Sequence, residues 1–369
     1  MRLRHSLLSG CVLTLGLVHS VFAGNILSTL RPDRMSENGS KQTVGGRKDH
    51  AVVDWIRKAP KAELHVHLDG AFDVALLWKQ AKAMPPEDIP KEKHTPWSGD
   101  LLQIREQLTS SLGSLPEFEA AISAEGKTGG LGQVLDCFEL FFPLVKGNKR
   151  IIEELTAAFC QAQMDQNVIY TEVRYAPHLL AAAASDIPKT TLPDAASVVT
   201  AITNVLQAWC KTHPDFPVNQ ILCCVDGMPD ISPEVAELAI KFKGHEGGVV
   251  GVDVACGEFS FTTDDAKHIA AFNTHQAALR KAKEAGLGVT VHAGESGSGA
   301  NVVRALEQYG ADRIGHGYSI FSHEEALARC RDAARRPHIE VCPTSSIMCE
   351  SVPDPDHKPR TGARTWDAR

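Results

Sequence analysis

The chain has 369 residues, which is enough for one large domain or two of ordinary size. Charged residues make up 22% and the hydrophobic set 43%, as is typical of a globular protein with a sizeable core. A net charge of −7 argues against a nucleic-acid partner, because proteins that bind polyanions usually present a basic face. The ten cysteines lie mainly in apolar segments without zinc-finger spacing, which indicates buried thiols more than a disulfide scaffold.

The first 23 residues are organised like a secretory signal peptide. Two arginines near the start precede an apolar run from Leu7 to Phe22, and Ala23 provides a small residue at the expected cleavage point. Small and polar residues inside the run make it a poor membrane anchor. We therefore expect a secreted chain without a membrane span, a cytoplasmic chain being the alternative. A flexible lead-in is expected over residues 24–50, with a glycosylation sequon at Asn38.

From residue 51 onward, apolar runs of strand length alternate with helical patterns. Near-continuous Val and Ile runs that alternate with helices are typical of a parallel α/β sheet. Helices are expected before Pro60 and around Ala181, and over residues 72–84, 233–243, 264–285, 301–309 and 324–335. Strands are expected after Pro60, within residues 61–70, and over 168–175, 219–225, 248–255, 288–292, 312–316 and 338–342.

Polar residues recur at the carboxyl ends of these seven expected strands. In a (β/α)8 barrel of the TIM type, that end of the strands carries the catalytic residues. We therefore predict an α/β fold of this type, with its barrel domain over residues 51–346. Such a barrel needs an eighth strand, yet residues 347–369 show no clear pattern. We expect a divergent, irregular tail there, with the eighth strand and the closing helices missing.

A pair of histidines ends the first expected strand. His65 and His67 lie two residues apart, so in a strand their imidazoles project to the same face. Imidazole is the commonest metal ligand, although surface histidines on a strand end are the alternative interpretation. His292 follows a clear later strand and offers a third imidazole. Three protein ligands with one open position are typical of a catalytic zinc site.

Three further positions carry possible chemistry at strand ends. Glu295 begins where a strand gives way to a Gly- and Ser-rich loop, and a carboxyl there could transfer protons; a helix-start carboxylate is the alternative. His316 stands between two glycines that allow a close approach, the alternative being a core histidine with a satisfied hydrogen bond. Gly257 could offer its backbone N–H to a ligand.

The segments HVHLDG, YTEVRYAPHLL, VVGVDVACGE, VTVHAGE, RIGHGY and EVCPTSS occur in this order between about residues 60 and 346. Together they resemble the adenosine deaminase family. The resemblance implies one Zn²⁺ per chain, held by His65, His67 and His292, with His67 also beside the substrate. It also implies a hydrogen bond from the ribose 5′-hydroxyl to Asp69.

The same resemblance assigns roles in the reaction. Glu295 would donate a proton to purine N1, and His316 would orient the attacking hydroxide. In the family a glycine N–H contacts purine N3. An ungapped match places Cys256 at that glycine and Gly257 one position later, so the backbone N–H of either residue could make this contact.

The implied activity is zinc-dependent hydrolysis of adenosine and 2′-deoxyadenosine to inosine and ammonia, with a purine nucleoside as the small-molecule partner. An inactive, truncated form that binds nucleoside or a partner is one alternative. Another purine-directed amidohydrolase, such as an adenine deaminase, is a second. The sequence indicates no oligomeric state.

Two departures from the family pattern bear on activity. Residues 119–134 interrupt a segment that is nearly continuous in the family, as a tolerated surface loop or an artefact of splicing. The eighth-strand motif SLNTDDP, whose aspartates bind zinc and purine N7, has no counterpart. Asp354, Asp356 and Asp367 lie in a stretch without strand pattern. We therefore expect weak or no turnover.

Overall fold

The computed structural model describes residues 50–85, 101–124, 130–182, 191–262, 265–332 and 336–352. The expected signal peptide, the sequon at Asn38 and nearly all of the lead-in lie outside these residues. So does the tail from residue 353 onward, with its three aspartates. The predictions made for those stretches therefore stay predictions.

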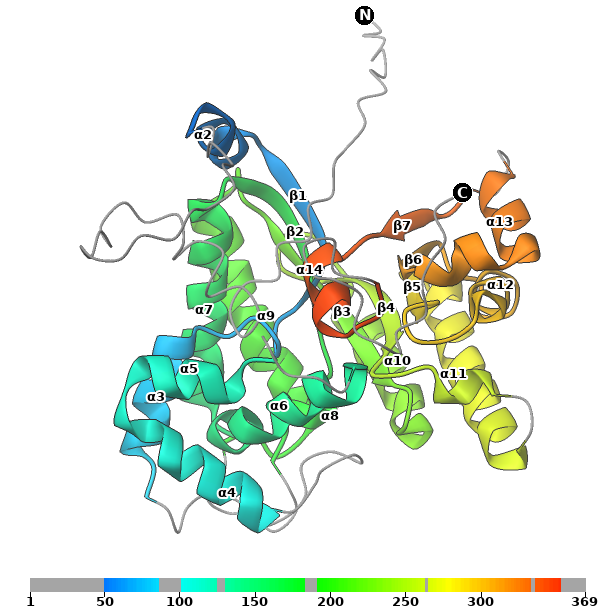
Figure 1. The fold of residues 1–369 in the computed structure, drawn as a ribbon. Coiled ribbons are helices and arrows are strands. Elements are labelled where there is room, and N and C mark those ends of the chain that lie inside the picture. The colour runs from blue at the N-terminus through cyan, green and yellow to red at the C-terminus, as the bar shows by residue number, and fades with distance from the viewer. Residues whose placement is uncertain are drawn as a thin grey trace, which may run out of the picture.

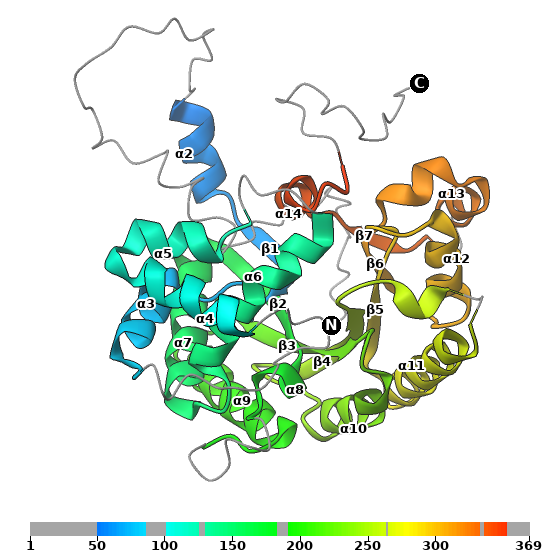
Figure 2. The same cartoon turned by 60° about the horizontal axis from the view of Figure 1, so that its bottom comes forward.

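Seven parallel strands form one sheet in which each strand pairs with the next along the chain. All residues of the third strand are buried, because helices cover its outer face and side chains fill the barrel on its inner face. Figure 2 shows the strands curving into a nearly closed barrel with helices outside it. The strands are β1 (Lys61–His67), β2 (Val168–Tyr175), β3 (Val218–Val225), β4 (Val249–Ala255), β5 (Gly288–Ala293), β6 (Arg313–His316) and β7 (His338–Glu340).

The helices lie around the strands and, between β1 and β2, form a separate group on one side of the barrel (Figure 1). No helix within the described ranges is long and apolar enough to cross a membrane. The helices are α2 (His50–Lys58), α3 (Val74–Ala83), α4 (Leu101–Ser110), α5 (Leu115–Ile122), α6 (Gly130–Val145), α7 (Lys149–Asp165), α8 (Pro177–Leu180), α9 (Ala195–Thr212), α10 (Ser232–Lys241), α11 (Ala266–Glu284), α12 (Gly299–Glu307), α13 (Glu324–Arg331) and α14 (Pro343–Met348). Short 3₁₀ turns are η2 (Ser111–Gly113), η4 (Pro229–Ile231), η5 (Phe259–Phe261) and η6 (Tyr318–Ser322).

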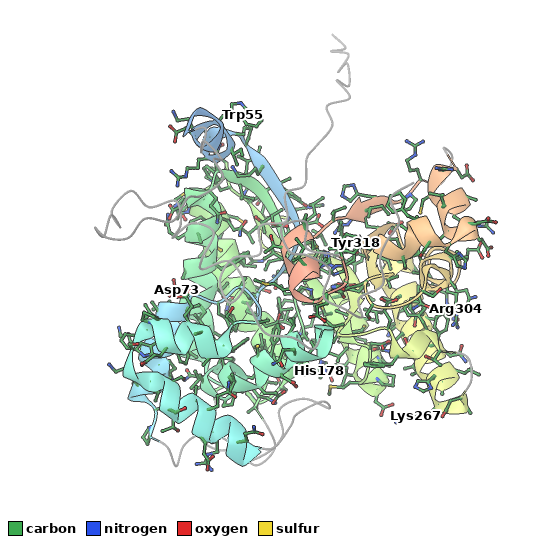
Figure 3. All side chains as sticks on the ribbon, viewed as in Figure 1. Trp55, Asp73, His178, Lys267, Arg304 and Tyr318 are labelled. Atoms are coloured by element: carbon green, nitrogen blue, oxygen red, sulfur yellow. The ribbon has the colours of Figure 1, made fainter. Side chains whose placement is uncertain are left out.

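The predicted (β/α)8-type architecture with a missing eighth unit is confirmed for the described residues. Among them, no strand pairs with the free edges of β1 and β7. Helix α14 lies between these two strands in both views (Figures 1 and 2). The Tyr318 hydroxyl, seen beside α14 in Figure 3, accepts a hydrogen bond from the Cys342 N–H at 3.0 Å, which attaches the start of α14 to η6.

The expected helix around Ala181 is wrong. Helix α8 is a single turn that ends at Leu180, and Ala181 is already extended, with φ −71° and ψ 154°. The long helix that follows β2 is α9, which begins at a capping box formed by Asp194 and Ser197. Alanine has high helix propensity, but the Ala182 N–H donates to the Leu192 carbonyl instead, so a tertiary contact overrides the propensity.

Candidate active site

Four histidines meet at the carboxyl ends of three strands. His65 and His67 come from β1, His292 from β5 and His316 from β6. The His65 ring centroid lies 4.7 Å from that of His292 and 4.9 Å from that of His316. His67 Nε2 and His292 Nε2 are 3.1 Å apart. These four rings and the Glu295 carboxyl form what we call the polar floor of the pocket.

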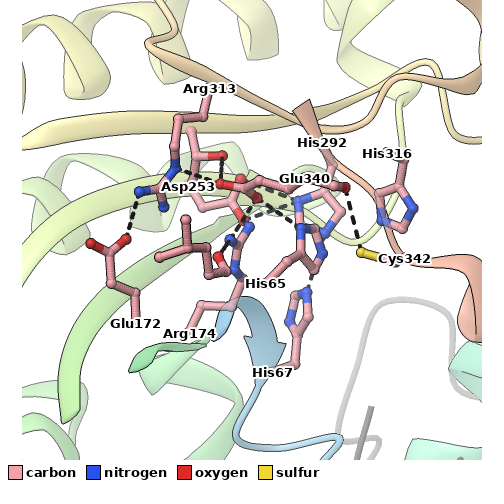
Figure 4. A network of polar contacts seen from close by, with 12 residues as sticks. His65, His67, Glu172, Arg174, Asp253, His292, Arg313, His316, Glu340 and Cys342 are labelled. Carbon is pink, nitrogen blue, oxygen red and sulfur yellow. Dashed lines mark hydrogen bonds and ion pairs between the residues drawn. The ribbon is translucent and has the colours of Figure 1, made fainter. Parts of the chain in front are cut away.

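Buried carboxylates orient two of these imidazoles through their Nδ1 atoms. Glu340 on β7 lies 2.8 Å from His65 Nδ1, and Asp253 on β4 lies 3.0 Å from His292 Nδ1 (Figure 4). A carboxylate on one ring nitrogen fixes the tautomer that leaves the other nitrogen free as a ligand. The Nε2 atoms of His65 and His292 are therefore available toward the pocket.

Arg174 holds both carboxylates in the barrel interior. Its guanidinium lies 2.7 Å from Asp253 Oδ2 and 2.7 Å from Glu340 Oε2, and all three side chains are fully buried. Arg313 adds a contact of 2.6 Å to Glu340 and another of 2.6 Å to Glu172 (Figure 4). Because Glu340 belongs to β7 and His65 to β1, this network also connects the two edge strands of the sheet through side chains.

The charges of the network follow from these contacts. Burial alone would raise the pKa of Glu340, but Arg174 and Arg313 outweigh it and hold that pKa at about 2. Burial also opposes protonation of His292, yet the Asp253 carboxylate raises its pKa. Burial, together with Arg174 and the neighbouring histidines, lowers the pKa of His65 well below its usual value.

The donor set fits a cation. One ring nitrogen from each of His65, His67 and His292 lies within 4.8 Å of the other two, and the carboxylates behind them supply compensating negative charge. Three imidazoles with borderline-soft nitrogen donors suit zinc. A second possible group, His65, His316 and Cys342, shares His65 with the first.

Glu295 and His316 form the proton-carrying part of the floor. Their side chains are buried, and His316 Nδ1 lies 3.5 Å from Glu295 Oε1. Burial raises the pKa of Glu295 to about 7; His292 opposes this rise and the Glu258 carboxylate reinforces it. His316 has a positive φ of 66°, a strained conformation for a residue with a side chain, and such strain is concentrated at functional sites.

Gly315 explains how β6 reaches the cluster. A Cβ atom there would lie 3.0 Å from His65 Cε1, so a larger residue would push the His65 ring out of place. The neighbouring Gly317 has a φ of +68°, which is accessible to glycine at little cost. The glycines on both sides of His316 therefore permit close packing of the rings.

All seven residues predicted from the sequence line one pocket. Asp69, just beyond β1, is buried, and its Oδ2 accepts a long hydrogen bond of 3.3 Å from the Ala176 N–H. Within the described part of the chain, Asp69 Oδ1 has no hydrogen-bond partner, and His67 Nδ1 lies 3.9 Å away. The seven are His65, His67, Asp69, Gly257, His292, Glu295 and His316.

The opposite side of the pocket is apolar. Helix α6 supplies what we call the α6 wall, and Phe138 within it lies against Phe141 and Phe142 at ring distances of 5.2 and 5.4 Å. The wall consists of Leu131, Val134, Leu135, Phe138 and Phe142. These side chains give this side of the pocket an apolar surface.

The α6 wall corrects the expectation of a surface loop over residues 119–134. Part of this stretch belongs to α5 and part to α6, and Ile122 and Val134 are buried. Residues 125–129 lie outside the described ranges. The Ala- and Gly-rich composition suggested a loop, whereas the buried positions emerge only when the two helices pack against each other.

Sequence reasoning missed the carboxylates behind the histidines. Asp253 stands alone inside the Val-rich strand β4, and Glu340 ends the short strand β7; an unpaired buried charge at either position would be costly. Such a charge within a strand that must be buried on both faces predicts a partner in the barrel interior. That signal was present in the sequence, but the identity of each partner was not.

Solved structures share this fold at low sequence identity. The Arabidopsis ADAL protein in complex with IMP matches with a TM-score of 0.59 and 21% identity, covering 81% of this chain and 75% of that chain. An adenine deaminase from Arthrobacter aurescens matches at 0.56 and 19%, covering 79% and 75%. An amidohydrolase from Burkholderia ambifaria with bound Zn matches at 0.58 and 22%, covering 84% and 71%. At these identities the matches define only the class of barrel folds to which this chain belongs.

Sequence comparison narrows this class to one family. The family model described as adenosine deaminase matches residues 60–361. Adenosine deaminase from Bos taurus is 32% identical over 306 residues, which cover 81% of this chain and 74% of the relative. The Gallus gallus enzyme is 30% identical over 296 residues, covering 78% and 72%. The chain belongs to the adenosine deaminase family and is an amidohydrolase enzyme, and the family and the Zn-bound neighbour suggest a metal cofactor.

Proposed function

We propose that this protein is a zinc-dependent deaminase that converts adenosine and 2′-deoxyadenosine to inosine and ammonia. The observation that carries the proposal is Asp69, a buried carboxyl in the pocket whose Oδ1 lacks a hydrogen-bond partner in the described residues. A buried polar atom of this kind is costly unless a ligand satisfies it. A ribose hydroxyl can donate to it.

The metal would be held by His65, His67 and His292, whose ring nitrogens converge. When bound, zinc supplies the Lewis acidity that makes water a nucleophile near neutral pH. The Arg174 network would keep two of these imidazoles in place, because it fixes the carboxylates that contact His65 and His292.

Glu295 and His316 would move the protons. With a pKa of about 7, Glu295 is substantially protonated at neutral pH and can donate to a purine ring nitrogen, which makes the adjacent carbon more electrophilic. Burial and the neighbouring histidines lower the pKa of His316 well below its usual value, so its neutral imidazole can orient the attacking water and accept its proton.

The pocket favours a nucleoside over a nucleotide. Among the described residues, those that line it include no lysine or arginine to bind a phosphate. Once the Asp69 carboxyl is ionised, its negative charge would repel a 5′-phosphate. The α6 wall instead offers apolar side chains to the sugar and the base. The Arabidopsis ADAL structure contains the nucleotide IMP. We therefore expect this chain to differ from that protein in its substrate.

The proposal is tested with four compounds and one variant. We expect purified protein with zinc to act on adenosine and 2′-deoxyadenosine, at least about 100-fold better in kcat/KM than on AMP or adenine. Asp69→Asn should lower kcat/KM for adenosine by about 10- to 100-fold and leave the rate with adenine unchanged, because adenine has no ribose. A metal chelator should abolish activity, and added Zn²⁺ should restore it.

The outcomes separate the alternatives. Preference for adenine would favour the adenine deaminase interpretation, and preference for AMP would refute the nucleoside assignment. Inosine binding without turnover, in a zinc-loaded sample, would favour a non-catalytic nucleoside-binding protein. Calorimetry measures the binding of inosine. The change in ultraviolet absorbance as ammonia is released measures turnover.

A further inference from the structure

The Glu258 carboxylate is bound by a ring of donors from another strand's loop. Glu258 follows β4, and the donors belong to the loop that follows β5 and to the start of α12. Oε1 accepts from the N–H groups of Glu295, Ser296 and Gly297 at 2.9, 3.0 and 2.9 Å, and Oε2 accepts from the Gly294 N–H at 3.0 Å and from Asn301 Nδ2 at 2.6 Å.

Only a carboxylate suits this ring. Successive backbone N–H groups that converge on one point form an anion-binding concavity. Two carboxylate oxygens offer about four lone-pair sites, whereas a glutamine would turn its NH₂ group toward N–H donors. The fit is tight, because a Cβ atom at Gly297 would lie 2.4 Å from Glu258 Oε2.

A second carboxylate fixes the chain on the other side of Glu258. Asp226, just beyond β3, accepts from the Phe259 N–H at 2.6 Å and from the Ser260 N–H at 3.1 Å. Asp226 is itself buried beside His275, whose Nε2 lies 3.2 Å from the Asp226 carbonyl. The ends of β3, β4 and β5 are thus joined in series by two carboxylates that bind backbone N–H groups.

We propose that Glu258 is a positioning residue that holds the 294–297 loop, and so the side chain of Glu295, at the distance from the substrate that proton transfer requires. This inference rests on the proposed deaminase function. Glu258 does not line the pocket, whereas Glu295 does and lies 3.5 Å from His316. Glu258 therefore acts through the loop and does not touch the substrate.

The test compares two carboxylates that bind the backbone at opposite ends of β5. Glu258→Gln removes the anion at the carboxyl end. Asp312→Asn is the matched control, because Asp312 accepts from the Val289 N–H at 3.0 Å near the amino end of the same strand, away from the pocket. Both variants keep the size of the side chain and lose one negative charge.

We expect Glu258→Gln to lower kcat for adenosine by about 10- to 100-fold, with KM changed less than about threefold and zinc content retained, because a small misplacement of a reacting group has effects of this size. Asp312→Asn should leave kcat within about twofold. A Glu258→Gln kcat within twofold of the wild type, or a loss that only matches lost zinc, would overturn the proposal.

Hydrogen exchange provides a readout that does not need turnover. The amides of residues 295–297 should exchange at least about 10-fold faster in Glu258→Gln than in the wild type. In Asp312→Asn, the exchange rates of these amides should equal those of the wild type. If the wild type deaminates none of the substrates, the proposed function fails, yet this measurement still tests the anchoring. Unchanged exchange in Glu258→Gln would overturn the anchoring directly.

A milder variant covers the case in which Glu258→Gln does not fold. Asn301→Ala removes one of the five donors and leaves the carboxylate with its four backbone N–H groups. We expect a kcat loss of about two- to fivefold with KM unchanged. A loss confined to KM would contradict the positioning role, because it would place the effect in substrate binding.

Discussion

The polar floor and the α6 wall meet in one pocket but are built in different ways. The floor comes from strand ends, and buried carboxylates on the strands orient two of its imidazoles: Glu340 contacts His65 and Asp253 contacts His292. The wall comes from a helix in the segment between β1 and β2, and apolar packing holds it. The barrel therefore determines the chemistry, and the inserted helix determines which molecules reach it.

The difference also concerns how precisely each part must be placed. Directed contacts of about 3 Å fix the floor, so a small change there should affect the reaction step. Apolar contacts in the wall are non-directional and depend on area, so a change there should affect binding more than reaction.

The largest effect should come from Glu295→Gln in the floor. We expect kcat to fall by about 100- to 10,000-fold with zinc content unchanged, because the variant cannot donate a proton. In the wild type, the acid must be protonated, so kcat/KM should fall as the pH rises through about 7, the pKa of Glu295. A pH–rate profile and metal analysis check this. An alkaline limb that persists unchanged in the variant would contradict the assignment.

A second effect should appear in stability when the support of the floor is broken. Glu340→Gln removes the negative charge that compensates the buried positive charges of Arg174 and Arg313. We therefore expect the free energy of unfolding to fall by about 3 kcal/mol or more. Zinc affinity should fall by about 10- to 100-fold, because His65 loses its carboxylate. Urea unfolding and zinc titration measure the two effects.

The pH dependence of this stability difference has a definite sign. The folded-state pKa of Glu340 is about 2, below its usual value of 4.5, so its contribution is fully present above about pH 4.5 and is lost as the pH falls toward 2. The difference between wild type and Glu340→Gln should therefore narrow over that window. A difference that stays constant down to pH 3 would show that the carboxylate charge is not its source.

The smallest effect should come from the wall. Phe138→Ala removes aromatic area from the pocket, and we expect KM for adenosine to rise about 5- to 20-fold with kcat changed less than threefold. Phe321→Ala is the control, because Phe321 on η6 is 80% exposed. Steady-state kinetics of both variants provide the comparison. A kcat loss that exceeds the KM change would place Phe138 in the reaction step.

Much of the floor could be predicted from the sequence. The alternation of buried strands and helices predicted the parallel barrel, and the rule that polar residues gather at strand ends selected His65, His67, His292 and His316. The same reasoning failed at Ala181, because helix propensity is weak compared with a tertiary hydrogen bond. It also failed at residues 119–134, where composition suggested a loop and packing buried Ile122 and Val134.

The strand ends, the histidines on them and the family can be recognised from the amino-acid sequence alone, because they depend on local periodicity and short motifs. The tertiary structure decided which carboxylate faces which imidazole, and that Glu258 binds the loop of Glu295. Asp253 and His292 are 39 residues apart in the chain, and His65 and Glu340 are 275 apart. Such pairs depend on strand register and on the curvature of the barrel, which no local pattern encodes.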